Sequence, residues 1–149
     1  MRAILQRVSS AKVVIDEKIS GEIASGLLVL LGITHDDTDA DIGWMIKKIT
    51  QLRIFNDDQE KMNLSVQDIG GDLLVVSQFT LFANSKKGNR PSYIDSAPPD
   101  VAIPLYEKFL EMLRTTFTGK VETGEFGASM RVSLVNEGPV TIILDSKEK

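Results

Sequence analysis

Residues 26–33, Gly-Leu-Leu-Val-Leu-Leu-Gly-Ile, form an unbroken apolar run that is bounded by glycine. The run is far too short to span a membrane as a helix, and it lacks the polar alternation of a half-exposed strand. It is typical of a central strand that is buried on both faces, and residues 73–79 show the same pattern. The chain is therefore expected to build its fold around two deeply buried strands.

Two segments have the spacing of amphipathic helices. Apolar residues recur at Ile42, Met45, Ile46 and Ile49, and Thr38 followed by Asp41 resembles a capping box, which predicts a helix over residues 38–51. A second helix is predicted from apolar residues that share one face, with Pro104 near its first turn or at a kink. These residues are Ala102, Leu105, Tyr106, Phe109, Met112, Leu113 and Phe117.

Several shorter segments have strand character, and turns separate them more often than helices do. The further predicted strands are 2–8, 11–15, 19–23, 52–55, 120–123, 130–135 and 141–144, while residues 61–66 are ambiguous. Residues 83–99 are polar and proline-containing, and they predict a long surface loop. The pattern favours one α+β domain over residues 1–149, with a mostly antiparallel, barrel-like sheet and two main helices.

Composition excludes several classes of site. The chain has no cysteine and a single histidine, His35, so disulfides, thiolate chemistry and a histidine-rich metal site are excluded within one chain. The net charge of −4 provides no general attraction to nucleic acid, and no DNA partner is expected. No apolar run of 18 residues and no signal peptide are present, so we expect a cytoplasmic protein without a membrane partner.

Hydroxyl groups near the end of the second buried strand are the candidate nucleophiles. Ser77 and Thr80 lie at this position, but neither belongs to a Gly-x-Ser-x-Gly elbow. Their only possible imidazole base is His35, which is more simply interpreted as a solvated loop residue. The sequence therefore contains no complete acid–base set.

Gly138-Pro139 interrupts the strand pattern between residues 130–135 and 141–144. On residue types alone this pair indicates a hairpin turn, because glycine and proline both favour turns. A second interpretation depends on a partner segment elsewhere in the chain, Ser77-Gln78-Phe79-Thr80-Leu81.

Together, residues 77–81 and the segment Asn136-Glu137-Gly138-Pro139-Val140-Thr141 resemble the two signature motifs of D-aminoacyl-tRNA deacylases, the D-tyrosyl-tRNA deacylase family. Residues 6–8, 88–93 and 127–130 also match, so the resemblance spans essentially the whole chain. It implies an editing hydrolase that cleaves the ester of D-aminoacyl-tRNA, binds the aminoacylated end of tRNA and needs no cofactor or metal.

The resemblance also implies a homodimer in which the Gly138-Pro139 peptide is cis and enters the active site of the other subunit. There it presents carbonyl groups to the α-amino group of the substrate and excludes an L side chain, whereas a D side chain points outward. Glycine has no side chain to exclude, so glycyl-tRNA is an expected substrate.

The resemblance assigns roles to individual residues. Backbone N–H groups around Phe79 and Thr80 are expected to stabilise the oxyanion, and Gln78 to orient the terminal adenosine or the carbonyl group. Ser77 belongs to the same catalytic motif. Arg7 is expected to hold the Gly-Pro segment by bonding its carbonyl groups, and the alternative is an ordinary edge-strand cation. Asn136 belongs to the filter motif. Met130 either lines the pocket or packs in the core.

Lys86, Lys87 and Arg90 form the densest basic cluster in the sequence. Without the resemblance they describe a solvated loop, and with it they are candidate contacts for the phosphates of the tRNA acceptor end. Two alternative functions stay open at this stage. One is a non-catalytic binder of RNA 3′ ends, and the other is a conventional small esterase that uses Ser77 or Thr80.

Overall fold

The structure is a computed structural model that describes residues 1–148. Its elements in chain order are β1 (Arg2–Ile15), β2 (Lys18–Ile23), β3 (Gly26–Gly32), α1 (Asp39–Gln51), β4 (Phe55–Asn56), β5 (Met62–Leu64), β6 (Asp72–Ser77), the 3₁₀ turn η1 (Phe79–Phe82), α2 (Pro99–Thr116), β7 (Val121–Thr123) and β8 (Arg131–Asp145).

Strand β1 is the hub of the main sheet. It pairs antiparallel with β2, β3 and β8, while β3 continues in parallel to β6 and β6 in parallel to β7. The two ends of this sheet approach each other, since the Ser20 hydroxyl donates to the Thr123 carbonyl at 3.2 Å. A Cβ at Gly21 would lie 2.8 Å from the same carbonyl oxygen, so the close approach depends on glycine. The sheet is thus nearly closed, and the predicted barrel-like α+β fold is confirmed.

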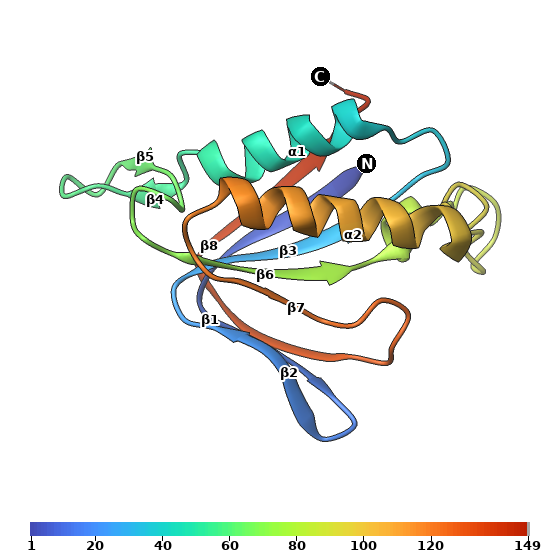
Figure 1. Cartoon of the computed structure of the whole chain (residues 1–149), viewed down its shortest axis with the longest axis horizontal. Helices are drawn as coiled ribbons and strands as arrows, with labels where there is room; N and C mark the ends of the chain where they lie inside the picture. Colours follow the sequence, from blue (N-terminus) through green and yellow to red (C-terminus); the bar gives the residue numbers. More distant parts are fainter. Residues whose placement is uncertain (149) are drawn as a thin grey trace.

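Both long helices cover the same side of the sheet (Figure 1). The larger core lies between them and the sheet, and it contains Leu27, Val29 and Leu31 of β3 together with Phe109 of α2. A smaller core lies on the opposite face of the sheet and includes Leu28. Strand β3 is therefore buried on both faces, as its apolar run predicts. Neither helix among residues 1–148 is long and apolar enough to cross a membrane.

The two predicted helices and the buried strand β3 are confirmed, but three strand predictions need correction. The second buried strand is predicted over residues 73–79, whereas β6 ends at Ser77 and Phe79 is exposed in the turn that follows. Residues 2–8 and 11–15 belong to one continuous strand, because β8 pairs with both parts of β1. The predicted strand at residues 52–55 is wrong. Helix α1 extends to Gln51, and only Phe55–Asn56 pair, in a small ribbon with β5.

The hairpin interpretation of Gly138-Pro139 is also wrong. Strand β8 runs in one direction from Arg131 to Asp145, and the parts before and after Gly138-Pro139 both pair antiparallel with β1. A hairpin needs the two flanking segments to pair with each other, whereas here a third strand takes both. The glycine and proline instead lie in an insertion within a single long strand.

The start of α1 predicts a pH-dependent contribution to stability. Burial alone would raise the pKa of Asp41, but hydrogen bonds from the Thr38 backbone, Ser146, the Thr38 side chain and Lys147 outweigh burial and hold this pKa well below its usual range. A lowered pKa stabilises the fold fully above the pKa of unfolded aspartate, about 3.9, and the stabilisation is lost as pH falls towards the folded value.

We expect Asp41→Asn to lower the free energy of unfolding at neutral pH by about 1–2 kcal/mol, the usual contribution of a cap. The difference from wild type should shrink when urea unfolding is repeated at pH ~2.5, because the unfolded wild-type chain then binds a proton at Asp41 while the folded chain keeps the carboxylate ionised. An equal difference at both pH values contradicts the assignment.

Candidate active site

A pocket of about 270 Å³ opens where β3 and β6 end. These strands are parallel, with Leu31 of β3 opposite Ser77 of β6, so their carboxyl ends share one edge of the sheet. The side chains that line the pocket are apolar or neutral. They are Leu31, Ile33, Val76, Ser77, Gln78, Phe79, Ser96, Ala97, Ala102, Phe126, Ala128, Met130 and Val132, with Gly127.

The chain makes a tight turn at the mouth of the pocket. After β6 the Gln78 N–H donates to the Leu31 carbonyl at 2.8 Å, and η1 then begins at Phe79. In a 3₁₀ turn the first N–H groups have no acceptor within the turn, so those of Phe79, which lines the pocket, and Thr80, which follows it, are not used by the turn itself. The Gln78 side-chain amide donates to the Thr80 hydroxyl, which fixes the two side chains relative to each other.

The pocket contains no acid or base of its own. None of the described residues that line it has a titratable side chain. Tyr106 lies nearby, where its hydroxyl donates to the Val75 carbonyl at 3.2 Å, and burial raises its pKa to about 12. Tyr106 therefore stays protonated at neutral pH and is a poor general base.

His35 does not supply the missing base. Its Nε2 lies 2.8 Å from the Ile94 carbonyl oxygen, and the side chain is exposed on the loop after β3. His35 is not among the residues that line the pocket. A Ser77–His35 or Thr80–His35 nucleophile pair thus has no support in the geometry.

The second motif forms an insertion in β8 that faces Arg7. Gln6 is paired with Thr141 and Val8 with Asn136, so four residues of β8, 137–140, stand opposite the single residue Arg7. The Arg7 side chain is buried. Its guanidinium donates to the Glu137 carbonyl at 3.0 Å, the Ile54 carbonyl at 2.8 Å and the Asn56 side chain at 3.3 Å. The predicted contact of Arg7 with a carbonyl of this segment is present.

The insertion, residues 137–140, is closed at its base by Asn136. The Asn136 side-chain oxygen accepts the Val140 N–H at 3.1 Å, and its amide donates to the Thr141 hydroxyl at 3.0 Å. Gly138 has φ +130°, and a Cβ there would lie 2.9 Å from the Arg7 guanidinium. Only glycine fits this position. The Gly138-Pro139 peptide is cis, and both residues are exposed.

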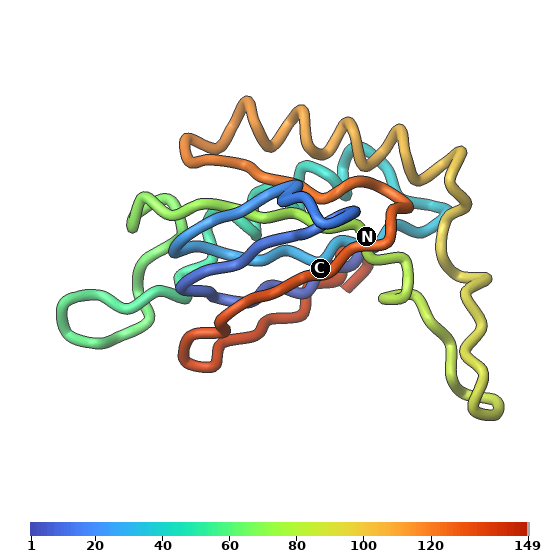
Figure 2. Tube along the Cα trace, turned by 90° about the horizontal axis from the view of Figure 1, so that it is seen from below, coloured from blue at the N-terminus to red at the C-terminus, as the bar shows by residue number. Residues whose placement is uncertain are grey.

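The two motifs do not meet within one chain. Neither Gly138 nor Pro139 lines the pocket, and Figure 2 shows the bend of β8, in red, at one end of the sheet and the segment after β6, in yellow-green, towards the other. Met130 does line the pocket together with Ser77, Gln78 and Phe79. Thr80 does not line the pocket, and it is tied to the pocket residue Gln78 through its hydroxyl. The motif residues named from the sequence thus fall into a group at the pocket and a group at the insertion.

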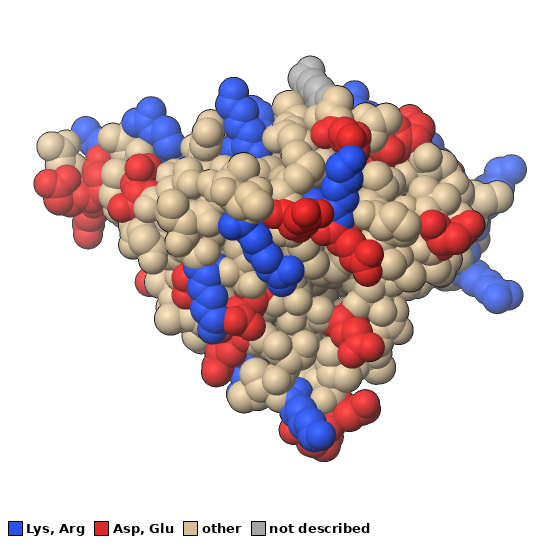
Figure 3. Space-filling model, viewed as in Figure 1, with Lys and Arg blue, Asp and Glu red and all other residues tan. Residues whose placement is uncertain are grey.

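The basic cluster lies on a third surface. Lys86, Lys87 and Arg90 are exposed on the loop after η1, which is pinned by a two-way backbone pairing of Asn84 with Ser92. Basic side chains project from the edge of the molecule where this loop runs (Figure 3). A shallow hollow there is lined by Asn84, Lys86, Lys87, Arg90 and Ser92, with no carboxylate among them.

Sequence reasoning did not identify three parts of the pocket wall. Ser96 and Ala97 come from the end of the long loop, and Phe126 packs against Tyr106 with ring centroids 5.6 Å apart. Small and apolar residues of this kind have no signature of their own. Only the match at residues 127–130 pointed to this region.

Fold and pocket together define a small barrel-like α+β protein with a neutral pocket at the carboxyl ends of β3 and β6. A family model described as D-Tyr-tRNA(Tyr) deacylase matches residues 4–145. The chain is 58% identical over 149 residues to a D-aminoacyl-tRNA deacylase of Flavobacterium psychrophilum, covering 100% of this chain and 99% of the relative. It is 57% identical over 148 residues to a D-aminoacyl-tRNA deacylase of Fusobacterium nucleatum, covering 99% and 97%.

A solved structure described as c-Myc DNA Unwinding Element Binding Protein superposes with a TM-score of 0.93 at 41% identity, covering 97% of this chain and 98% of that one. A probable eukaryotic D-amino acid tRNA deacylase superposes with a TM-score of 0.82 at 18% identity, covering 96% and 97%, and supports the fold alone. The chain belongs to the D-Tyr-tRNA(Tyr) deacylase family. The family resemblance and the prediction of a hydrolase are thereby confirmed.

The contacts of Arg7 predict that it fixes the insertion. Arg7→Lys keeps the charge but loses the planar fork of donors, so buried carbonyl groups are left unpaired. We expect the free energy of unfolding to fall by about 1–3 kcal/mol and the backbone amides of residues 136–141 to exchange hydrogen faster.

Arg53→Lys is the matched control, because Arg53 donates to one carbonyl, that of Asn63, at an exposed site. Wild-type exchange at residues 136–141 in the Arg7→Lys variant contradicts the role given to Arg7.

Proposed function

We propose that this protein hydrolyses the ester bond of D-aminoacyl-tRNA to release the free D-amino acid and tRNA. Membership of the deacylase family supports the substrate class. The structural observation behind the mechanism is the pocket, which has no titratable side chain among its described lining residues and lies beside the first N–H groups of η1. A site of this kind accelerates a reaction by positioning and by stabilising the oxyanion.

The substrate supplies the reactivity that the pocket lacks. An aminoacyl ester is already activated, and the neighbouring hydroxyl of the terminal ribose can assist the attack of water. The N–H groups of Phe79 and Thr80 stabilise the oxyanion, and Gln78 orients the carbonyl group or the terminal adenosine. The Thr80 hydroxyl accepts a hydrogen bond from Gln78, which favours a positioning role for Thr80.

Chiral selection is assigned to the insertion at residues 137–140. Its exposed Gly138-Pro139 has no functional side chain and offers backbone carbonyl groups to a ligand, and hydrogen bonds of Arg7 and Asn136 hold the insertion in place. Carbonyl groups accept hydrogen bonds from the α-amino group of the substrate, and the closely approaching backbone leaves no room for an L side chain. A D side chain points away, and glycine has none.

The separation of the two motifs supports a homodimer. The insertion does not line the pocket of its own chain, so it can act on a substrate there only if it comes from a second copy. The insertion is exposed in the single chain, and Val135 beside it and Ile143 further along β8 are exposed apolar residues of the same strand. A two-fold symmetric pair exchanges two insertions at once and completes two sites.

Lys86, Lys87 and Arg90 are assigned to the phosphates of the tRNA acceptor end. The three cations have no carboxylate within ion-pair distance among the described residues, which leaves them free for phosphate on a chain of net charge −4. Aminoacyl-tRNA is made and used in the cytoplasm, which is the compartment we propose for the enzyme. DNA is not a proposed partner, and a DNA oligonucleotide serves as a competitor to test that.

Three charged forms of one tRNA test the substrate class and the filter. We expect D-aminoacyl-tRNA and glycyl-tRNA to be hydrolysed quickly and the L-aminoacyl-tRNA to react about 100-fold more slowly or worse. The measurement is release of labelled amino acid in single-turnover reactions. If glycyl-tRNA reacts no faster than L-aminoacyl-tRNA, the steric filter is contradicted, even if D-aminoacyl-tRNA is hydrolysed.

The same assay separates the alternatives. A non-catalytic binder of RNA 3′ ends protects the D-aminoacyl ester instead of releasing the amino acid. A conventional esterase hydrolyses the ethyl ester of the same D-amino acid as readily as the tRNA ester. The proposed enzyme does neither, because its reaction needs the terminal ribose.

Subunit mixing tests whether the site is shared. Gly138→Ala disturbs the insertion, and Thr80→Pro removes one N–H donor at the second residue of η1, where proline fits a turn. Each variant alone should be inactive. After reassortment half of the dimers are mixed and each has one intact site, so activity should return to about 25% of wild type.

The control for this experiment is a chain that carries both substitutions, mixed with Gly138→Ala. No intact site can form in that mixture, and no activity should return. If native mass spectrometry detects mixed dimers of the two single variants but they stay inactive, the insertion does not act across subunits.

A further inference from the structure

One wall of the pocket is formed by a short loop segment, residues 94–97, to which the proposed mechanism gives no role. Residues 94–97 contribute Ser96 and Ala97 to the pocket. This segment is bonded to the loop after β3 at three points. The Ala97 N–H donates to the Ile33 carbonyl at 3.0 Å, the Thr34 hydroxyl donates to the Asp95 carbonyl at 2.6 Å, and His35 Nε2 lies 2.8 Å from the Ile94 carbonyl oxygen.

Asp37 fixes that loop from the inside of the molecule. Its side chain is fully buried, and its second carboxylate oxygen accepts the Thr34 N–H at 2.8 Å. The other oxygen accepts from the α-ammonium group of Met1, which is equally buried and also donates to the Ser146 hydroxyl at 2.8 Å. Lys147 Nζ lies 3.5 Å from Asp37, so two cations face this carboxylate.

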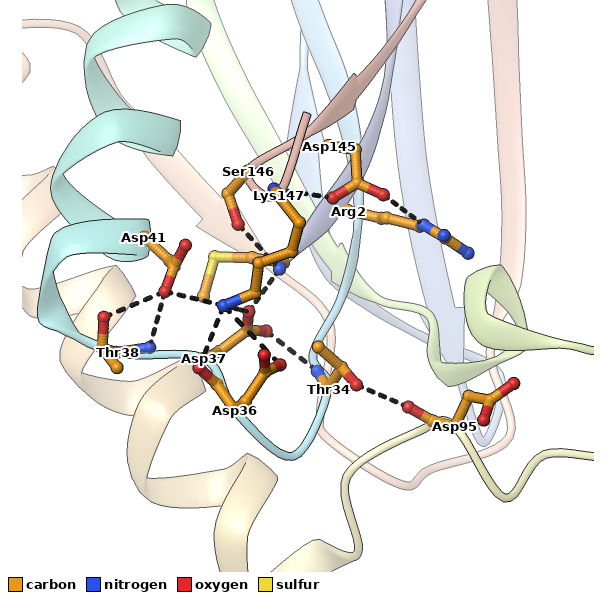
Figure 4. A network of polar contacts seen from close by, with 11 residues as sticks. Arg2, Thr34, Asp36, Asp37, Thr38, Asp41, Asp95, Asp145, Ser146 and Lys147 are labelled. Carbon is orange, nitrogen blue, oxygen red and sulfur yellow. Dashed lines mark hydrogen bonds and ion pairs between the residues drawn. The ribbon is translucent and has the colours of Figure 1, made fainter. Parts of the chain in front are cut away.

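Figure 4 shows these groups as one continuous network from the ends of β1 and β8 to Asp95. Burying a charged group is unfavourable unless the group is paired and hydrogen-bonded. The Asp37–Met1 pair therefore holds the backbone groups that it bonds in one geometry. The path then runs from the Met1 ammonium through Asp37 and Thr34 to the Asp95 carbonyl, next to the residue Ser96 that lines the pocket.

We propose that Asp37 and Thr34 are positioning residues for the deacylase pocket, which hold the wall at residues 94–97 in place for the substrate. The buried Asp37–Met1 pair fixes the Thr34 backbone, and the Thr34 hydroxyl transmits that position to the wall. The kinetic part of this inference rests on the proposed deacylase function. The structural part, that Thr34 keeps residues 94–97 in one conformation, does not rest on that function.

Thr34→Val tests the last step without disturbing the buried pair, because it removes only the hydroxyl that bonds Asp95. Loss of one hydrogen bond predicts that KM for D-aminoacyl-tRNA rises about 2- to 10-fold while kcat changes little. Hydrogen exchange at residues 94–97 should accelerate by a similar factor. Thr34→Ser keeps the hydroxyl and should restore both values. Asp37→Asn should give the same changes together with a lower melting temperature.

Asp145→Asn is the matched control, because it removes the charge from the Arg2–Asp145 ion pair of 2.7 Å in the same corner of the fold. Asparagine keeps a side-chain oxygen that can accept the Lys147 N–H, which bonds the Asp145 carboxylate at 2.9 Å. Within residues 1–148 the Asp145 side chain bonds Arg2 and Lys147 and makes no hydrogen bond or ion pair with residues 33–37 or 94–97. The free energy of unfolding should therefore fall, while KM and exchange at residues 94–97 stay at wild-type values. The inference is overturned if Thr34→Val behaves like wild type in both measurements, or if Asp145→Asn changes them equally. Failure of the wild-type protein to hydrolyse the substrate rejects the deacylase function, and the exchange data still decide the role of Thr34.

Discussion

The buried guanidinium of Arg7 is the contact on which the arrangement of the functional segments depends. Arg7 lies on the central strand at the larger of the two breaks in the β1–β8 register, and it fills that gap with donors to three oxygen acceptors. A buried charge without such acceptors is unfavourable, so the cation and the insertion require each other. The insertion, residues 137–140, is therefore exposed to solvent and yet held in place by its contact with Arg7.

The pocket and the insertion each lack groups that the other provides. In the proposed mechanism the pocket supplies N–H donors but no group that selects chirality, and the insertion supplies carbonyl acceptors but no catalytic group. Within one chain the sheet holds them at separate ends (Figure 2), so rigidity in each part is useful only if a second copy brings them together. A neutral pocket also fits a substrate whose ester is reactive before it binds.

Local patterns predicted the elements but not how they meet. Helix α1 was predictable because the apolar spacing and the Thr38–Asp41 cap are both local in sequence, and β3 because its run has no polar face. The insertion was not, since glycine and proline suit a hairpin as well as a bulge. The outcome depends on whether the flanking segments pair with each other or with β1, which is more than a hundred residues away. The motif residues Gln78 and Gly138 were found through a family resemblance, whereas the wall residues Ser96 and Ala97 have no local signal.

The most direct test of the shared site is a crystal structure with a non-hydrolysable substrate mimic, an adenosine whose 3′ position carries a D-amino acid through an amide bond. The α-amino group should lie about 3 Å from a carbonyl oxygen of Gly138 or Pro139 of the partner subunit, with the amide carbonyl facing the N–H groups of Phe79 and Thr80. A mimic bound with its α-amino group contacting only its own subunit or water, and with the insertion elsewhere, contradicts the account.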